Sequence, residues 1–265
     1  MGEILGKLHR KRNFEIGGIE NLNYPGTNLL FEIENHLPNY NLSIVKMISE
    51  CVPAESRGRA DYSILDFGAG TGHLAELLQN ETNSLVDCLE IDEVLGDKIL
   101  SKGMNLFRDI AELKQQYDLI YTSNVLEHIF DDCNIISQLY TFVKPGGVIC
   151  IYVPASPYIY SQLDYEVGHF RRYKRADLVS KVEGAKFTIS DVRYVDSLGY
   201  LASIVIKLCG FRSFGNIGGV SSLRFYDNYI FPFSRILDSI GMRRIIGKNL
   251  FCVASKIELL QNVEE

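Results

Sequence analysis

The residues with the clearest chemical signature form a glycine-rich loop. Gly68, Gly70 and Gly72 follow the apolar run Ile64-Leu65-Asp66-Phe67. Glycine is needed where the backbone must adopt a positive φ or where a ligand must touch the main chain. Residues 73–78 come next and have the apolar period of a helix, whose first N–H groups are unpaired and can bind polar ligand atoms. The loop is therefore expected to bind a ligand through its backbone.

Glu90 is the acidic partner of this loop. It lies eighteen residues after Gly72, at the end of the next apolar run, residues 85–89. A carboxylate at this place can accept hydrogen bonds from both hydroxyls of a ribose, as in dinucleotide-binding folds. A dinucleotide-binding loop would have its third glycine at position 73, where this chain has His73. The spacing predicts a nucleoside-containing cofactor, and a diphosphate is the weaker fit; a tight turn without a ligand is the alternative.

These residues need a sheet to position them. From residue 62 onward, short apolar runs alternate with helical periodicity, which is typical of strand–helix–strand units in a parallel sheet. We expect an α/β fold with a doubly wound, mostly parallel, seven-stranded sheet. The predicted strands are Ser63–Phe67, Leu85–Ile91, Met104–Phe107, Asp118–Ser123, Val148–Val153, Phe187–Tyr194 and Leu250–Ser255. The predicted helices are Asn28–His36, Asn41–Cys51, Gly72–Gln79, Val94–Ser101, Asp132–Val143, Arg175–Glu183 and Gly199–Leu208.

Prolines, glycines and cap residues predict where these elements end. Pro38 is expected to stop the first helix, and Asn41 is expected to cap the second. The run Lys144-Pro145-Gly146-Gly147 predicts a turn before the fifth strand. Residues 214–219 predict a glycine-rich loop, and Pro232 is expected to break a later helical stretch.

Changes in composition and hydrophobic pattern along the sequence divide the chain into three parts. We expect an N-terminal helical cap at 1–61, a cofactor-binding core at 62–194 and a C-terminal extension at 195–265 that completes the sheet and the acceptor side. Tyr24-Pro25 and Tyr40 are interpreted as part of a lid over the cofactor, with packing of the sheet edge as the alternative. The apolar stretches 204–208 and 225–233 are expected to be buried in the core or in a dimer, rather than exposed as a patch for a lipid-linked substrate.

Composition and charge exclude several classes of protein. The chain has 27 basic and 33 acidic residues, a net charge of −6 and no long basic block, so nucleic acid is not an expected partner. Its six cysteines never have the Cys-x-x-Cys spacing of a zinc site, so no metal is expected and free thiols in a reducing compartment are predicted. No signal peptide or membrane-spanning segment is predicted, and we expect a cytoplasmic protein that is a monomer or a homodimer.

The ordered motifs resemble those of the class I S-adenosylmethionine-dependent methyltransferases. Their nucleotide loop reads E/D-x-G-x-G-x-G, as residues 66–72 do here, and four further motifs follow at 108–110, 117–120, 124–128 and 144–147. The resemblance implies S-adenosylmethionine as cofactor and S-adenosylhomocysteine as product. It implies that Gly68 and Gly70 approach the methionine part, that Glu90 binds the ribose, and that Asp109 faces the adenine amine. Asn124 or Val125 would line the methionine side. The remaining residues expected at the cofactor are Asp66, Ala69, Ile91 and Ile110.

Two histidines are the candidate catalytic bases. Much of the catalysis of methyl transfer can come from alignment alone, but a hydroxyl acceptor is helped by a base within hydrogen-bond reach. His128 follows the predicted fourth strand, at the edge of the sheet where doubly wound folds bind ligands. His169 lies in the long aromatic loop after the fifth strand, where this architecture covers its acceptor. A structural role for His128, ordering the loop beneath the cofactor, is the alternative.

Arg171, Arg172 and Tyr173 are the candidate acceptor-binding residues. A guanidinium group can bind two oxygens of a phosphate or carboxylate at once. The alternative interpretation is that these charges belong to a solvated helix start. Tyr173 could form a wall against a sugar, although packing is common for tyrosines in such loops.

The segment from Val153 to Phe187 resembles a subgroup of class I enzymes associated with bacterial surface-polysaccharide and glycan assembly. The resemblance implies an acceptor that is small or carrier-linked, such as the hydroxyl of a sugar on a nucleotide or lipid diphosphate, with peripheral membrane contact as an option. The alternatives are a methyltransferase of a quinone or other isoprenoid-linked ring, an NAD-dependent oxidoreductase, and a catalytically idle cofactor-binding protein. Base methylation is disfavoured, because the Asn/Asp-Pro-Pro-Tyr segment of amino-methylating DNA enzymes is missing after the fourth strand.

Overall fold

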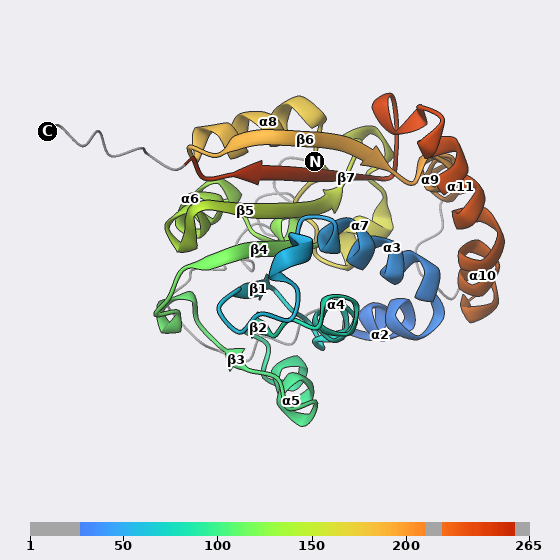
Figure 1. Cartoon of the computed structure of the whole chain (residues 1–265). Helices are drawn as coiled ribbons and strands as arrows, with labels where there is room; N and C mark the ends of the chain where they lie inside the picture. Colours follow the sequence, from blue (N-terminus) through green and yellow to red (C-terminus); the bar gives the residue numbers. More distant parts are fainter. Residues whose placement is uncertain (1–26, 210–218, 258–265) are drawn as a thin grey trace, which may run out of the picture.

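The computed structural model describes residues 27–209 and 219–257. Its centre is a seven-stranded sheet with the strand order β3-β2-β1-β4-β5-β7-β6 (Figure 1). β1 to β5 are parallel, and β7 runs antiparallel to both of its neighbours, β5 and β6. This confirms the predicted α/β fold with a mostly parallel sheet. The strands are β1 Ile64–Phe67, β2 Val86–Leu89, β3 Leu106–Phe107, β4 Tyr117–Ser123, β5 Val143–Pro154, β6 Thr188–Val195 and β7 Asn249–Ser255.

Two hydrophobic clusters hold helices against opposite faces of the sheet. One joins Leu65 and Ile120 of the strands to helices α6, Asp132–Phe142, and α8, Arg175–Gly184. The other joins Ile64 and Leu119 to α3, Pro38–Ser49, α4, His73–Thr82, and α5, Glu93–Ser101. Because neighbouring strand residues point to opposite faces, these buried strands are apolar on both sides. This explains why their sequence reads as continuous apolar runs.

The segment predicted as a turn before β5 is the first part of that strand. Val143 pairs with Tyr117, and the register between β4 and β5 then shifts before Leu119. Gly146 has a φ of +78° and donates its N–H to the carbonyl of Lys256 at 2.8 Å. The prediction was wrong because this long-range pairing with the chain that follows β7 holds the glycines in the sheet.

Two prolines lie in the first turn of a helix: the helix before Pro38 ends there as predicted, whereas Pro232 does not break the later helical run. Pro38 is in the first turn of α3, after α2, Thr27–His36, so Leu37 and not Asn41 is the N-cap residue. Pro232 is in the first turn of α11, Phe231–Ser239, which continues α10, Gly219–Phe225, through a π-helical turn, η7, Tyr226–Ile230. Proline is tolerated at the start of α3 because the N–H that it lacks would have no partner within the helix.

The remaining elements complete the chain on either side of the sheet. Helix α9, Ser197–Cys209, precedes α10. The short elements are η2 Ala54–Ser56, η3 Ile110–Glu112, η4 Leu126–His128, η5 Pro157–Ile159, α7 Gln162–Glu166 and η8 Met242–Arg244. Tyr24-Pro25 and residues 214–218 of the predicted glycine-rich loop lie outside the described residues. Within the two described stretches, no helix combines the length and hydropathy needed to span a membrane.

A buried carboxylate joins helix α3 to the helical run of residues 219–239. Asp227 accepts hydrogen bonds from the backbone N–H groups of Asn39 and Tyr40, both at 2.9 Å, in the first turn of α3. Negative charge is favourable at a helix N-terminus, and these N–H groups lack partners within the helix. The contact places α3 beside η7 and α11, although almost two hundred residues separate them in sequence (Figure 1).

The apolar stretches near 204–208 and 225–233 are largely exposed. Val205, Leu208, Phe225, Tyr229 and Phe233 each keep more than half of their side-chain surface accessible. The prediction that these stretches are buried in the core was therefore wrong for these residues. Residues inside the same stretches with buried side chains, such as Asp227 and Phe231, face the body of the protein instead.

Candidate active site

The glycine loop leaves β1 on a backbone that only glycine adopts easily. Gly68, Gly70 and Gly72 have φ values of +79°, +58° and +73°. The N–H groups of Gly68 and Ala69 donate to the carbonyl of Leu89 at 2.9 and 3.0 Å, so the end of β2 anchors the loop. A Cβ atom on Gly68 would lie 2.4 Å from Val125 Cγ2. Conformation and space both require the glycines that the sequence motif contains.

Glu90 lies at the end of β2, against this loop. Its side chain is buried, and its Oε2 atom accepts a hydrogen bond from Gly70 N at 2.7 Å. Its Oε1 atom accepts one from Asp92 N at 2.9 Å. Burial raises the pKa of this carboxyl, and the two backbone donors oppose the shift. The contacts fix the carboxylate where the loop turns.

Asp66 is held inside the protein below the loop. Its carboxylate is buried and accepts a hydrogen bond from the hydroxyl of Tyr121 at 2.8 Å. Burial raises the pKa of Asp66 to about 7, against the effect of that hydrogen bond. The same burial raises the pKa of Tyr121 far above its ordinary value. Asp66 therefore supports the loop from within as well as lining the cavity described next.

A cavity of about 870 Å³ brings together every residue that the sequence predicted at the cofactor. Asn124 follows β4 with a φ of +55°, and Asp109 accepts a hydrogen bond from Ala111 N at 2.8 Å, which begins η3. The glycines of the loop have no side chains to cover their main chain, and Glu90 lies beside the loop. The end of the cavity at the glycine loop therefore fits a polar ligand that contains a nucleoside. The predicted residues in the lining are Asp66, Gly68, Ala69, Gly70, Glu90, Ile91, Asp109, Ile110, Asn124 and Val125.

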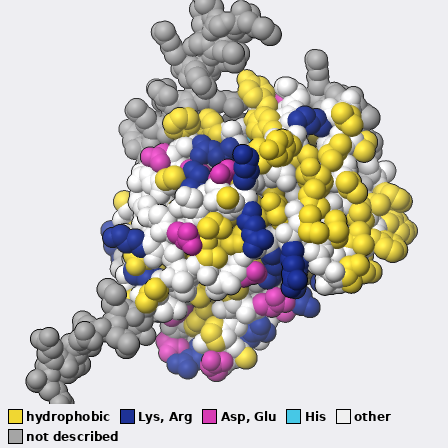
Figure 2. All heavy atoms as spheres, turned by 90° about the horizontal axis from the view of Figure 1, so that it is seen from above, with side chains coloured by type: hydrophobic (Ala, Val, Ile, Leu, Met, Phe, Trp, Pro, Cys, Tyr) yellow, Lys and Arg dark blue, Asp and Glu magenta, His cyan; other side chains and the backbone are white. Residues whose placement is uncertain are grey.

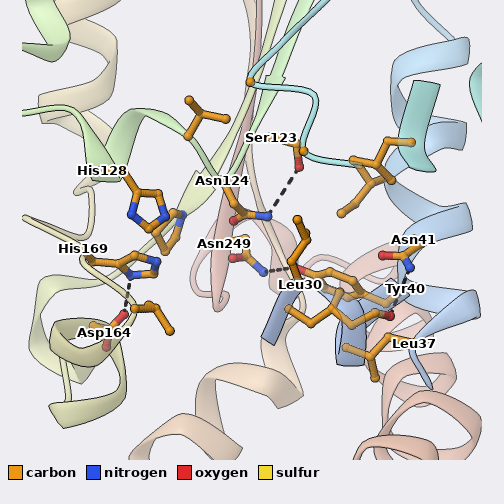
Figure 3. Close-up of a pocket in the computed structure, with 18 of the residues that line it drawn as sticks. Leu30, Leu37, Tyr40, Asn41, Ser123, Asn124, His128, Asp164, His169 and Asn249 are labelled. Carbon is orange, nitrogen blue, oxygen red and sulfur yellow. Dashed lines mark hydrogen bonds and ion pairs between the residues drawn. The ribbon is translucent and has the colours of Figure 1, made fainter. Parts of the chain in front are cut away.

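The cavity extends past the loop to two histidines and then to the C-terminal helices. In Figure 3, His128 and His169 lie together on one side, Leu37 and Tyr40 lie on the other, and Asn124 and Asn249 stand between them. Both predicted bases therefore face one cavity with the predicted cofactor residues. The side chains from α9, α10 and η7 that close the far end are mostly apolar: Ala202, Val205, Ile206, Leu223, Phe225, Tyr226 and Ile230.

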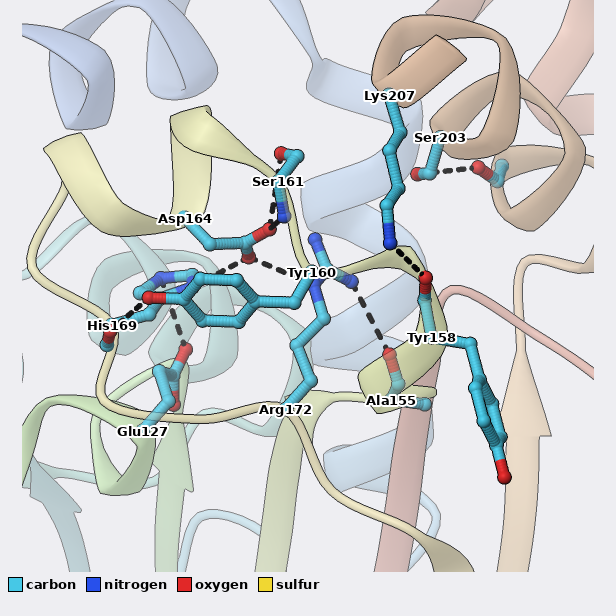
Figure 4. A network of polar contacts seen from close by, with 11 residues as sticks. Glu127, Ala155, Tyr158, Tyr160, Ser161, Asp164, His169, Arg172, Ser203 and Lys207 are labelled. Carbon is cyan, nitrogen blue, oxygen red and sulfur yellow. Dashed lines mark hydrogen bonds and ion pairs between the residues drawn. The ribbon is translucent and has the colours of Figure 1, made fainter. Parts of the chain in front are cut away.

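His169 is fixed by a carboxylate. Its Nδ1 atom lies 2.9 Å from Asp164 Oδ1, and that carboxylate also accepts hydrogen bonds from Arg172 Nε and Ser161 N at 2.8 Å each (Figure 4). Burial opposes ionisation of Asp164, but the hydrogen bond with His169 and the charge of Arg172 lower its pKa to about 2. Asp164 is therefore a permanent negative charge that orients the imidazole.

Glu127 and His128 lie next to this pair. The His128 and His169 rings meet edge to face at 4.7 Å, and His169 Nε2 lies 3.8 Å from Glu127 Oε1. Burial lowers the pKa of His128 to about 3, so it is a neutral imidazole. Burial also raises the pKa of Glu127 to about 7, and its two carboxyl oxygens have no hydrogen-bond partner within the described part of the chain.

The three side chains Glu127, His128 and His169 form a group that could hold a metal ion. Their candidate ligand atoms all lie within 4.8 Å of one another in the described residues. Histidine nitrogens and a carboxylate oxygen are ordinary ligands of zinc and related metals. Sequence reasoning selected the two histidines but not Glu127 or Asp164. Glu127 could have been selected from the sequence because it directly precedes His128.

Arg171 and Tyr173 do not line the cavity, so their predicted role in acceptor binding is corrected. Both contact the buried carboxylate of Asp132 at the start of α6: Arg171 Nη1 lies 2.8 Å from it, and Tyr173 Oη donates to it at 2.7 Å. Lys181 Nζ donates to the same carboxylate at 2.6 Å. Arg172 does line the cavity, but it pairs with Asp164 and donates to the carbonyl of Ala155.

The residues that the C-terminal part brings to the cavity were not predicted from the sequence. Asn249, at the start of β7, donates to Tyr40 Oη at 3.2 Å, and Tyr152 Oη donates to the same oxygen at 3.0 Å. Lys248 also lines the cavity, and burial lowers its pKa. These residues meet only because β7 inserts between β5 and β6.

Comparison with known proteins identifies the class that this fold and site define. A family model described as a methyltransferase domain matches residues 35–191, which is more than half of the chain. The chain therefore belongs to this methyltransferase family. The match covers the glycine loop, Glu90 and both histidines. The oxidoreductase alternative gains no support from it.

The relatives of this chain differ in the acceptors that their names give. The chain is 26% identical to a trans-aconitate 2-methyltransferase of Deinococcus radiodurans, over 54% of this chain and 58% of that protein. It is 23% identical to malonyl-[acyl-carrier protein] O-methyltransferase 1 of Ilyobacter polytropus, over 75% and 79%. It is 31% identical to a ubiquinone biosynthesis O-methyltransferase of Pseudomonas savastanoi pv. phaseolicola, over 36% and 45%. The chain thus spans less than two thirds of the first and third of these proteins.

Solved structures share the fold. Phosphoethanolamine N-methyltransferase 2 of Haemonchus contortus in complex with S-adenosylmethionine has a TM-score of 0.59 at 16% identity, covering 92% of this chain and 61% of that one. The plantazolicin methyltransferase BpumL in complex with S-adenosylhomocysteine has a TM-score of 0.56 at 14% identity, covering 86% and 88%. Family and fold together confirm the expected cofactor, S-adenosylmethionine.

Proposed function

We propose that this protein transfers the methyl group of S-adenosylmethionine to an oxygen atom of an acceptor with a large apolar part. The observation that carries the proposal is the single cavity, which runs from the glycine loop past His128 and His169 to an apolar wall on α9 and α10. A donor held at the loop and an acceptor held at the apolar wall would meet at the histidines. Holding both reactants in line supplies much of the catalysis of such a transfer.

The donor end is assigned to the residues that the sequence motifs selected. Gly68 and Gly70 would approach the methionine part, Glu90 would accept hydrogen bonds from the ribose hydroxyls, and Asp109 would accept one from the adenine amine. Asn124 and Val125 would close the methionine side. The buried position of Glu90 supports its role, because a carboxylate held by two backbone donors keeps a fixed orientation. The cofactor supplies a sulfonium-activated methyl group.

His169 is the base that we assign to the acceptor hydroxyl. A hydrogen bond from Nδ1 to Asp164 would leave Nε2 as the atom that accepts a proton. Nε2 would take the hydroxyl proton as the new carbon–oxygen bond forms and the carbon–sulfur bond breaks. His128 is a weaker candidate, because a pKa of about 3 makes it a poor proton acceptor. We assign it to positioning beside His169.

The apolar lining favours a ring linked to an isoprenoid or similar chain over a sugar phosphate. The arginines that would meet a phosphate are engaged elsewhere, Arg171 with Asp132 and Arg172 with Asp164. The far end of the cavity presents aliphatic and aromatic side chains from α9, α10 and η7. The relatives named ubiquinone biosynthesis O-methyltransferases agree with this substrate class. The sugar hydroxyl that the sequence favoured is therefore the less favoured acceptor.

Two measurements test the proposal. Calorimetric titration with S-adenosylmethionine, S-adenosylhomocysteine and NAD should give binding heat for the first two only; preference for NAD would reverse the assignment. Formation of S-adenosylhomocysteine should then be followed with hydroxylated aromatic rings that have isoprenoid chains and with nucleotide-linked sugars. Turnover of the sugars alone would restore the sequence-based acceptor, and donor binding without turnover of any acceptor or cell extract would favour an idle cofactor-binding protein.

A further inference from the structure

The C-terminal helices present a continuous apolar stripe to the outside. Phe225, Tyr229, Phe233, Ile236 and Ile240 are between 57% and 75% exposed. Their spacing of three or four residues places them on one side of the helical run from α10 through η7 to α11. Monomeric proteins seldom leave such a stripe in water without a partner. We call these five residues the apolar stripe.

Helix α9 widens this surface. Leu201, Val205 and Leu208 recur at helical spacing, and each has more than half of its side-chain surface exposed. Helix α9 packs against α11, so the two exposed apolar sides adjoin. The space-filling view shows the result as a broad hydrophobic area over this side of the molecule, with basic side chains at its margin (Figure 2).

The charges around the apolar stripe have a single sign. The exposed charged side chains of residues 219–245 are all arginines: Arg224, Arg235, Arg243 and Arg244. Three of them directly precede an exposed apolar residue in the sequence. The two acidic residues of the same stretch face inward, since Asp227 accepts from Tyr40 N and Asp238 accepts from Asp196 N. The whole chain has a net charge of −6, so this surface is a local exception.

The exposed apolar surface and the wall of the cavity share residues. Val205 and Phe225 line the cavity and are also 57% exposed, each on the surface just described. An acceptor with a hydrocarbon chain could therefore place its reactive head near His169 while its chain leaves the cavity beside α9 and α10. This relation links the surface to the catalytic site through the side chains themselves.

We propose that α9, α10 and α11 dock the protein on a lipid bilayer that contains anionic lipids. Exposed aromatic and branched side chains enter the boundary between headgroups and acyl chains, and arginines beside them meet the lipid phosphates. This inference deepens the proposed function and rests on it in one respect. The purpose of docking would be to give a lipid-linked acceptor a path into the cavity. The docking itself is measurable without turnover, so its failure and the failure of the proposed function are distinguishable.

A single tryptophan makes the docking visible. The chain has no tryptophan, so Phe233→Trp places the only reporter in the apolar stripe, at a residue that does not line the cavity. Its emission should shift to shorter wavelength with vesicles of phosphatidylcholine and phosphatidylglycerol, and much less with phosphatidylcholine alone. The matched control is Leu85→Trp, at an apolar side chain that is also exposed but lies at β2. The control emission should not change; equal shifts at both sites would overturn the proposal.

Loss-of-binding variants complete the test in a vesicle flotation assay with the full chain. Phe233→Asp with Ile240→Asp should abolish flotation, whereas Leu85→Asp with Leu100→Asp should not. Arg235→Gln with Arg244→Gln should lower the partition constant on anionic vesicles by roughly 30-fold and should weaken its salt dependence. A Phe233→Asp, Ile240→Asp variant that floats like the wild type would overturn the proposal, as would an Arg235→Gln, Arg244→Gln variant with unchanged partition. Donor binding measured by calorimetry confirms that each variant is folded.

The rival occupants give different results in the same experiment. If a second copy of the chain covers the apolar stripe, the Phe233→Trp emission will shift with protein concentration instead of vesicles, and ultracentrifugation will show a dimer that Phe233→Asp dissociates. If another segment of the same chain covers it, the emission will already be at short wavelength without lipid and at every concentration. Either outcome, with no vesicle response, overturns the membrane surface.

Discussion

His169 and the buried carboxylate of Asp164 form an imidazole–carboxylate pair, with Nδ1 and Oδ1 2.9 Å apart. Arg172 Nε contacts the same carboxylate oxygen at 2.8 Å, and the hydrogen bond with His169 together with the charge of Arg172 keeps Asp164 ionised (Figure 4). The pair is built from one short segment, residues 161–172, after β5. In the proposed mechanism this pair orients the imidazole, and its Nε2 atom would accept the proton of the acceptor.

The first prediction concerns this base. His169→Asn should lower kcat by about 10²–10⁴-fold, because proton removal from the acceptor hydroxyl would have no base, and the Kd for S-adenosylmethionine should stay within twofold of the wild type. His128→Asn is the matched variant and should cost much less. The measurements are initial rates of S-adenosylhomocysteine formation and calorimetric donor binding. A His169→Asn enzyme with wild-type kcat would show that alignment alone drives the reaction.

The second prediction concerns the fit between Gly68 and Val125. Gly68→Ala should destabilise the fold and weaken donor binding, because its Cβ atom would lie 2.4 Å from Val125 Cγ2 at a positive φ. Gly103→Ala is the control for the backbone alone, since Gly103 has a φ of +73° and nothing within 4 Å of a Cβ. Thermal melting should show the larger loss for Gly68→Ala. Adding Val125→Ala to Gly68→Ala should recover part of the lost stability. If the stability losses of the two substitutions simply add in the double variant, the clash is relieved in some other way.

The third prediction concerns the ribose. Glu90→Ala should weaken binding of S-adenosylmethionine by about 1–3 kcal/mol, the scale of hydrogen bonds to a charged group. Asp87→Ala tests a hydrogen-bonded carboxylate on the same strand that does not line the cavity, and it should leave the affinity unchanged. Calorimetry at one ionic strength compares the two. If Glu90→Ala binds the donor like the wild type, Glu90 does not contact the ribose.

The fourth prediction concerns the pH dependence of stability. Burial raises the pKa of Asp66 from 3.8 to about 7, so between those values the folded state holds a proton that the unfolded state has lost. The free energy of unfolding should therefore fall as the pH rises through this window, by at most about 4 kcal/mol for this group. Glu127 acts in the same direction, because burial raises its pKa to about 7 as well.

Asp66→Asn should flatten that slope but not abolish it, because Glu127 still titrates. Urea unfolding of the protein without cofactor, at several pH values from 4 to 8, provides the measurement. An unchanged slope in Asp66→Asn would mean that Asp66 is ionised in the folded protein throughout the window. The Tyr121 hydroxyl would then hold the carboxylate charge by itself.

The fifth prediction separates the two interpretations of Arg171. Arg171→Ala should lower the free energy of unfolding by about 1–2 kcal/mol, because the buried carboxylate of Asp132 loses one of its cations while Lys181 remains. Arg175→Ala, at an exposed position on α8, should have little effect on stability. The KM for the acceptor should not change in either variant. A raised KM with normal stability would instead support the acceptor role inferred from the sequence.

Local features of the sequence predicted which residues gather around the glycine loop. The ten residues expected at the cofactor all line one cavity, and the glycine loop has the positive φ values that its composition implies. Such features are short in range: a strand, a turn that only glycine allows, and a helix start lie within a few residues of one another. The parallel sheet then places Glu90 next to the loop, because β1 and β2 are neighbours in register.

Long-range packing decided the rest. Partners 39 or more residues away in the chain decided whether Arg171 faced a substrate or Asp132. Distant partners also decided whether the C-terminal helices were buried or exposed. The amino-acid sequence by itself determined the class of fold and the cofactor loop, because those depend on local periodicity and backbone conformation. Only the tertiary structure decided the acceptor side, because an ion pair or an apolar side chain is assigned its role by whichever distant element the fold brings against it.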